Sequence, residues 1–196
     1  MTYDGLQQVK SEESLHLGGN MVEGDPFSFS PGVWNYVIDR FCIKSVLDLG
    51  SGLGHSSEYF FSKGMRVIAV DGMKDNIPKA LYPTIEFDIT KGPVNCEADL
   101  VHCQEVVEHI DEEFLDNVLR SLANGKIILL TNALPGQDGY HHVNEQETEY
   151  WIRHLKRYNC HVLSEDTQRI RYLASSEGAR YLAATGTLYA NRDKLY

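Results

Sequence analysis

Paired cysteines are missing from this chain. Its four cysteines, Cys42, Cys96, Cys103 and Cys160, form no C-x-x-C pair, and three of them lie in or beside apolar runs. We therefore expect four reduced thiols that serve in packing, and no disulfide framework.

Long apolar runs are missing as well. The longest, Ile127 to Leu130, is far too short to cross a bilayer. The first twenty residues contain Glu12 and Glu13 and no apolar stretch, so no secretory signal is predicted. Together these absences predict a cytoplasmic protein without a membrane segment.

Basic residues are scarce. The chain has 18 lysines and arginines against 28 acidic residues, which gives a formal net charge of −10. Nonspecific binding to nucleic acid rests mainly on basic side chains, so we expect a small-molecule partner and regard nucleic acid as disfavoured but open. Arg153, Lys156 and Arg157 fall at helical spacing and predict the solvated face of a helix, with a local phosphate-binding patch as the alternative.

Length and composition predict a single domain over residues 1–196. A chain of 196 residues can bury a substantial core, and its hydrophobic and charged fractions, 42% and 23%, are those of an ordinary globular domain. Within it we expect an N-terminal arm or lid over residues 1–30 and a cofactor-binding core over residues 45–190. Nothing in the sequence indicates an oligomeric state.

Strand-like and helix-like runs alternate along the chain. This order predicts an α/β fold with a mainly parallel sheet covered by helices on both faces. Ser30-Pro31 predicts a helix start, and Gly64 and Gly125 predict helix ends. The strands are expected at Ser45–Leu49, Arg66–Asp71, Thr84–Asp88, Asp99–Cys103, Lys126–Thr131, Cys160–Leu163 and Tyr181–Ala190.

The most informative segment is Ser45 to Gly54, S-V-L-D-L-G-S-G-L-G. It is an apolar strand that contains Asp48 and runs into glycines at positions 50, 52 and 54. Glycines let a ligand approach the main chain, and a following helix would point its first amide groups at the same crevice. The segment predicts a loop that holds a charged small molecule.

A second acidic strand end narrows the ligand class. Arg66 to Asp71 is another buried-strand run, and its terminal acid is placed to bind ribose hydroxyls. The two acids with the glycine loop favour an adenosine nucleoside. A dinucleotide site would want glycine or alanine where this chain has His55, so a nicotinamide cofactor is disfavoured.

These motifs resemble the class I S-adenosylmethionine-dependent methyltransferases. The resemblance is carried by D-x-G-x-G-x-G at Asp48 to Gly54, by Asp71, by F-D-I at Phe87 to Ile89, and by D-L-V-H-C-Q-E-V-V-E-H at Asp99 to His109. It implies a Rossmann-like sheet of seven strands, the last antiparallel, and S-adenosylmethionine as cofactor. The cofactor-binding residues that it implies are Asp48, Gly50, Ser51, Gly52, Gly54, Asp71, Gly72, Asp88, Ile89 and Gln104.

The element E-V-V-E-H, Glu105 to His109, follows the fourth expected strand. If it is helical, positions i, i+3 and i+4 share a face, so Glu105, Glu108 and His109 converge. His141 and His142 lie in the loop after the fifth strand, which opens on the same edge of the sheet. Oxygen and imidazole donors suit a divalent ion such as Mg²⁺, Mn²⁺ or Zn²⁺.

The E-x-x-E-H pattern is similar to the metal-binding stretch of small-RNA 3′-terminal 2′-O-methyltransferases and to the matching stretch of ubiquinone-biosynthesis O-methyltransferases. In those families the ion holds the accepting hydroxyl. The resemblance implies Glu105, Glu108 and His109 as ligands, and loop position adds His141 or His142, of which we choose His142. A metal-free site is the alternative, because helix dipoles favour acids in a first turn and a histidine can act as a base.

The sequence thus predicts an O-methyltransferase acting on a small-molecule or sugar hydroxyl, with His109, His142 and Glu105 as catalytic residues. The methyl group would pass directly from the sulfonium to the acceptor oxygen. Two alternatives remain: a metal-free methyltransferase that uses a histidine as general base, and an inactive regulatory protein that only binds the cofactor.

The stretch from His16 to Pro31 is rich in glycine, aromatic residues and turn formers. It is interpreted either as a lid that closes over cofactor and acceptor or as an ordered arm that packs on the sheet. The residues expected to contact the acceptor are Asn20, Asp25, Phe27 and Trp34. Tyr140, Tyr150 and Trp151 are expected to line the other wall, with a core position as the alternative for Trp151.

Overall fold

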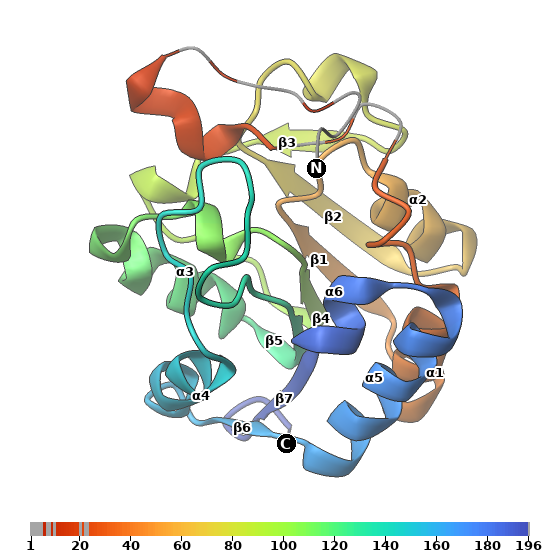
Figure 1. The fold of residues 1–196 in the computed structure, drawn as a ribbon. Coiled ribbons are helices and arrows are strands. Elements are labelled where there is room, and N and C mark those ends of the chain that lie inside the picture. Colours follow the sequence, from red (N-terminus) through yellow and green to blue (C-terminus); the bar gives the residue numbers. More distant parts are fainter. Residues whose placement is uncertain (1–5, 7–8, 10, 20, 22–23, 196) are drawn as a thin grey trace.

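A computed structural model describes the whole chain except residues 1–5, 7–8, 10, 20, 22–23 and 196. Its described residues form one seven-stranded sheet in the order β3-β2-β1-β4-β5-β7-β6 (Figure 1). The strands are β1 (Ser45–Leu49), β2 (Arg66–Asp71), β3 (Thr84–Glu86), β4 (Ala98–Cys103), β5 (Gly125–Leu130), β6 (Cys160–Val162) and β7 (Thr187–Asn191).

The sheet is parallel except for β7, which runs antiparallel to both β5 and β6. In the register of the parallel part, Asp48 of β1 stands beside Ala69 of β2 and His102 of β4. The carboxyl ends of the parallel strands therefore meet at one edge. The predicted Rossmann-like fold and its antiparallel last strand are confirmed.

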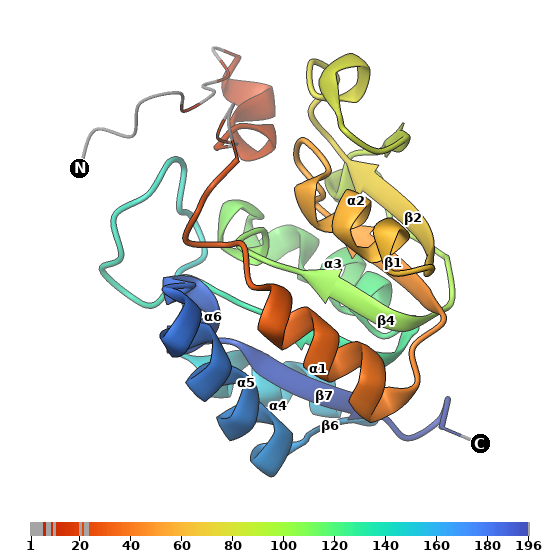
Figure 2. The same cartoon turned by 90° about the vertical axis from the view of Figure 1, so that its right-hand side faces the viewer.

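Helices cover both faces of the sheet (Figures 1 and 2). One face is packed by α1 (Pro31–Phe41), α2 (His55–Ser62), α5 (Ser164–Glu177) and α6 (Arg180–Ala184), and the other by α3 (Leu115–Leu122) and α4 (Thr148–Lys156). Short 3₁₀ helices lie at Glu12–Leu17, Ile77–Lys79, Ile89–Lys91, Val107–His109 and Glu112–Phe114. Each face of the sheet thus has its own hydrophobic core.

Residue chemistry explains the helix boundaries. Pro31 is the first residue of α1, and the apolar face of this helix buries Val33, Trp34 and Val37. Gly64, with φ +81°, follows the end of α2 as predicted. Gly125 is instead the first residue of β5, because α3 already ends at Leu122.

Three predicted strands are shorter than expected, and one of them, Cys160–Leu163, ends only one residue early, at Val162. The expected strand Tyr181–Ala190 begins only at Thr187, because residues 180–184 form α6, which buries Leu182. Alanines favour helix over strand, which explains the difference. β3 ends at Glu86 because the Asp88 side chain accepts from the Thr90 amide and begins a 3₁₀ helix.

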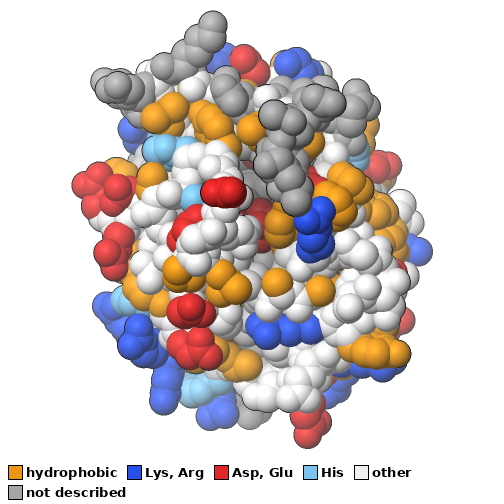
Figure 3. All heavy atoms as spheres, in the orientation of Figure 1, with side chains coloured by type: hydrophobic (Ala, Val, Ile, Leu, Met, Phe, Trp, Pro, Cys, Tyr) orange, Lys and Arg blue, Asp and Glu red, His pale blue; other side chains and the backbone are white. Residues whose placement is uncertain are grey.

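The remaining expectations concern cysteines, charge and membranes. All four cysteines are free, with Cys103 and Cys160 buried in the core. Arg153, Lys156 and Arg157 lie exposed on α4, where basic side chains gather at the lower left of Figure 3. Within the described part of the chain, none of the helices combines the length and the apolar character that a membrane span requires.

Candidate functional site

The glycine loop follows β1 at the carboxyl edge of the sheet. Gly50, with φ +73°, has no room for a side chain, because a Cβ there would overlap a methyl group of Val106. The amides of Gly50 and Ser51 donate to the Val70 carbonyl at 2.8 and 3.0 Å. The loop is therefore held close against β2, with its main chain facing the space above the sheet.

Asp48 and His102 form a buried pair beneath this loop. His102 Nδ1 lies 2.7 Å from Asp48 Oδ1, and the hydroxyls of Ser56 and Ser57 donate to Asp48 Oδ2. Burial would raise the pKa of Asp48, but His102 and the two serines outweigh it and lower that pKa. Asp48 is thus a carboxylate that ties β1, β4 and α2 together.

Asp71 fixes the other side of the loop. Its Oδ2 accepts from the Gly52 amide at 2.8 Å, and its Oδ1 accepts from Met73 and Asn76. Burial raises the pKa of this carboxyl, although these bonds oppose the shift. Asp71 therefore shapes the loop as well as facing the cavity where the resemblance places a ribose.

Two adjoining cavities open above the loop. The larger, of about 640 Å³, is lined by predicted residues Asp48, Gly50, Ser51, Gly52, Gln104 and Glu105. The smaller, of about 90 Å³, is lined by Asp71, Gly72, Ile89 and His109, and Gly50 and Glu105 line both. Gly54 lines neither cavity; it is the N-cap of α2, with φ +78°.

The N-terminal arm lies across the smaller cavity. His16 Nε2 is 3.0 Å from Asp88 Oδ1, and Leu17 packs over Gly72, where a Cβ would meet its side chain. Farther along, Gly18 lies against the ring of Tyr140. In Figures 1 and 2 the arm crosses the carboxyl edge of the sheet. Asp88, one of the predicted cofactor-binding residues, is thus bonded to the arm.

The expected acceptor residues are only partly assembled. Asp25 and Trp34 line the larger cavity, whereas the Phe27 ring lies 3.5 Å from the guanidinium of Arg180. Trp151 is a core residue, the Tyr150 hydroxyl donates to Glu112, and neither side chain lines the two cavities. Tyr140 contacts the arm through Val9. Asn20 lies outside the described residues.

The E-V-V-E-H element is not an α-helix. Glu105 has φ +54° and its amide donates to Thr131 Oγ1, and only Val107–His109 form a 3₁₀ turn. The bend after β4 nevertheless buries Glu108 completely, and neither of its carboxyl oxygens has a partner. A bend and a short turn thus bring Glu108 and His109 together, whereas Glu105, the third residue of the predicted convergence, is not part of the group of ligand atoms that lie within 4.8 Å of one another.

The loop between β5 and α4 brings a second histidine to this turn. Amides of Val143 and Asn144 donate to the Glu108 carbonyl, which anchors the loop. Ligand atoms of Glu108, His109 and His142 lie within 4.8 Å of one another, and the two imidazole rings are 5.1 Å apart. His142 rather than His141 therefore belongs to the cluster, and Glu105 lies beside Glu108.

Burial dominates the electrostatics of the cluster. It raises the pKa of Glu105 to about 7 and, with help from the Glu105 charge, raises the pKa of Glu108 well above its usual range. Burial, with the nearby His142, lowers the pKa of His109 to about 4. Within the described chain, no positively charged side chain bonds to these groups.

Several contacts of the site were not predicted from the sequence. They involve His16, His102, Gln137 and Glu145. A polar residue inside the strand run A-D-L-V-H-C is a signal for His102, because a histidine in a buried strand needs a partner. Glu145 and Gln137 reach His142 and Glu105 only because of the way the loop folds, and the sequence pattern does not indicate that fold.

A family model matches part of the sequence, and solved structures match the fold. Residues 47–130 match the family model described as a methyltransferase domain. The fold is similar to that of magnesium protoporphyrin IX methyltransferase (ChlM) from Synechocystis PCC 6803 with bound S-adenosylhomocysteine: 17% identity, TM-score 0.55, 66% of this chain and 70% of the other. No curated protein sequence matches the chain.

Two further solved structures show the same fold. The methyltransferase domain of a bacterial Hen1 protein, CtHen1-CN, is 18% identical with a TM-score of 0.54, over 67% of this chain and 84% of the other. An S-adenosylmethionine-dependent methyltransferase from Archaeoglobus fulgidus is 17% identical with a TM-score of 0.55, and the match covers 86% of this chain and 94% of the other. Residues 47–130 thus resemble a methyltransferase domain, and the chain shares the fold of these methyltransferase structures.

Proposed function

We propose that this chain is an S-adenosylmethionine-dependent methyltransferase that acts on the hydroxyl group of a small molecule or sugar, with a divalent cation held by Glu105, Glu108, His109 and His142. One observation carries the proposal. Glu108 is completely buried beside His109 and His142, and neither of its carboxyl oxygens has a partner. A buried carboxylate without partners is costly, and a bound cation would compensate that cost.

A divalent cation fits the donor set. Besides Glu108, the buried atoms Glu105 Oε1 and His109 Nδ1 also lack partners. Oxygen and imidazole donors suit Mg²⁺, Mn²⁺ and Zn²⁺, and a cation would favour the charged forms of both carboxyl groups. When bound, such an ion orients an acceptor hydroxyl and lowers its pKa.

The cluster borders the cofactor space. Glu105 lines both cavities and His109 lines the smaller one. Methyl transfer forms a carbon–oxygen bond as the carbon–sulfur bond of the sulfonium breaks, and the hydroxyl proton leaves to a base. The chain supports this displacement by holding the reactants in line and by covering them with the N-terminal arm, which excludes water.

The lining of the larger cavity indicates the acceptor class. Asp25, Glu105 and Glu177 line it together with the aromatic rings of Phe29 and Trp34. Among the described residues that line this cavity, none is lysine or arginine. A phosphate beside the accepting hydroxyl would find no cationic partner here, which supports an uncharged acceptor over a nucleic-acid terminus.

A metal-free enzyme is the second candidate. His142 Nδ1 lies 3.1 Å from Glu145 Oε1, an arrangement that orients the ring and leaves its other nitrogen to act as a general base. His109 is a poorer base, because its pKa is lowered to about 4. In this candidate His142 accepts the hydroxyl proton directly.

Methyl transfer after metal removal separates the candidates. Protein dialysed against EDTA would be assayed with labelled S-adenosylmethionine and a panel of sugars, phenols and catechols, with and without added Mg²⁺, Mn²⁺ or Zn²⁺. We expect product only with added metal, and bound S-adenosylhomocysteine in both samples. Full activity in the metal-depleted protein would contradict the metal proposal and favour His142 as general base.

A further inference from the structure

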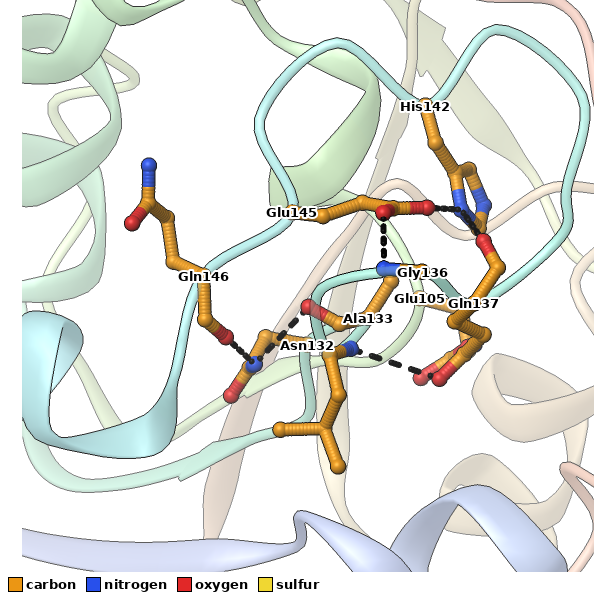
Figure 4. Close-up of polar contacts among 9 residues, drawn as sticks. Glu105, Asn132, Ala133, Gly136, Gln137, His142, Glu145 and Gln146 are labelled. Atoms are coloured by element: carbon orange, nitrogen blue, oxygen red, sulfur yellow. Dashed lines mark hydrogen bonds and ion pairs between the residues drawn. The ribbon is translucent and has the colours of Figure 1, made fainter.

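The loop of residues 131–147 holds the His142 ring by one nitrogen. His142 Nδ1 lies 3.0 Å from the Gln137 carbonyl oxygen and 3.1 Å from Glu145 Oε1 (Figure 4). Both partners accept hydrogen bonds, so Nδ1 must carry the ring proton. The lone pair of the neutral ring is therefore on Nε2.

Glu145 is itself held in place. Its second oxygen, Oε2, accepts from the Gly136 amide at 2.7 Å, so one carboxylate bridges the loop backbone and the histidine (Figure 4). The side chains of His142 and Glu145 are only 10% and 22% exposed. This geometry restricts both the rotation of the ring and the position of its proton.

Gly139 closes the other side of the ring. A Cβ at this position would overlap both Nε2 and Cε1 of His142, so the ring packs directly on the glycine backbone. Gly139 does not have a positive φ, so packing and not backbone conformation requires glycine here. The ring is thus held at Nδ1 by Gln137 and Glu145, and the backbone of Gly139 packs beside its Nε2 and Cε1 atoms.

We propose that Glu145 is a positioning residue that keeps Nδ1 of His142 protonated and Nε2 available to the Glu108–His109 cluster. The inference rests on the proposed function, in which Nε2 binds the cation. Outer carboxylates that bond a ligating histidine fix its tautomer and raise its basicity, and their loss typically weakens metal binding about 10- to 100-fold. Gln137 contributes through its carbonyl and its side chain, which reaches Glu105 Oε2 at 3.5 Å.

The first test reads the tautomer without metal. In ¹⁵N NMR of the metal-free protein at a pH where the ring is neutral, His142 should show a protonated Nδ1 and an unprotonated Nε2. Glu145→Ala should mix the two tautomers. A protonated Nε2 in the unmodified protein, or an unchanged tautomer in Glu145→Ala, would overturn the proposal.

The second test measures Mn²⁺ affinity by calorimetry. Glu145→Ala should weaken Mn²⁺ binding about 10- to 100-fold, and Glu145→Gln should weaken it less. Gly139→Ala should displace the His142 ring and weaken binding as much as His142→Ala does. Glu147→Gln is the matched control, because Glu147 is exposed in the same segment and its side chain makes no bond. Thermal melts check that each variant is folded. If Glu145→Ala binds Mn²⁺ as tightly as Glu147→Gln does, the role of Glu145 is contradicted.

The two readouts separate this inference from the proposed function. If the unmodified protein binds no Mn²⁺ but its His142 tautomer depends on Glu145, the metal proposal fails and the positioning role stands. If Mn²⁺ binds tightly and Glu145→Ala changes neither tautomer nor affinity, the metal proposal stands and the positioning role fails.

Discussion

Replacing Glu108 by glutamine should stabilise the metal-free protein at alkaline pH and also remove its response to metal. Burial raises the pKa of Glu108 well above its usual range, and raises the pKa of Glu105 from 4.5 to about 7. A carboxyl group with a raised pKa contributes stability that is fully present below its unfolded pKa and is lost as pH rises through the folded pKa.

The magnitude follows from proton linkage. Each pH unit between the unfolded and the folded pKa of one group costs about 1.4 kcal/mol of the free energy of unfolding. For Glu105 the range from 4.5 to about 7 is some 2.5 units, so its full loss is about 3 kcal/mol. His109 acts in the opposite sense, because its pKa is lowered from 6.5 to about 4. Its contribution to the free energy of unfolding is present above pH 6.5 and is lost as the pH falls toward 4.

Urea unfolding between pH 6.5 and 8.5 measures the titration of the carboxyl groups without that of His109, which stays neutral in the folded protein over this range. In EDTA the free energy of unfolding of the unmodified protein should fall by up to about 1.4 kcal/mol per pH unit, whereas Glu108→Gln should show a much smaller slope. Mn²⁺ at 100 times its dissociation constant should restore about 2.7 kcal/mol to the unmodified protein and little to the variant. Glu147→Gln is the control and should keep the pH slope of the unmodified protein. If Glu108→Gln has that same slope, the raised pKa of Glu108 is contradicted.

Three further results are expected. Asp71→Ala removes the acceptor of the Gly52 amide and the acid that faces the smaller cavity, so calorimetry should show S-adenosylhomocysteine binding weakened by about 1.5–3 kcal/mol; unchanged affinity would contradict this. Gly50→Ala should abolish cofactor binding because of its clash with Val106, whereas Gly64→Ala, also at positive φ but in open space, should keep it. Thiol counting in denaturant should find four reactive groups, and a lower count in freshly reduced protein would refute the free-thiol assignment.

The positions of the first two strands could be predicted because apolar runs with an acid at or near their ends are distinctive in sequence. Residues 45–49 and 66–71 were predicted with the bounds that the structure shows. The boundary near Tyr181 was wrong, because the helix α6 is short and its stability comes from burying Leu182, which is a tertiary contact. Short elements of this kind leave little periodic signal.

The acidic cluster could be predicted only in part. Spacing brought Glu108 and His109 together, although by a 3₁₀ turn instead of an α-helix. The choice of His142 over His141 depends on the path of the loop, which is anchored by amides donating to the Glu108 carbonyl. The pair of Asp48 and His102 depends on strand register, which places residues 54 positions apart in contact. Backbone bonds and register of this kind cannot be read from residue spacing.

The proposed mechanism depends on a divalent cation that Glu108, His109 and His142 bind next to the cofactor. The most direct measurement is anomalous diffraction from crystals grown with Mn²⁺ and S-adenosylhomocysteine. We predict a manganese peak at bonding distance from Glu108, His109 and His142, with the cofactor over the glycine loop. A cofactor bound over the loop with no manganese peak at these three side chains would contradict the claim.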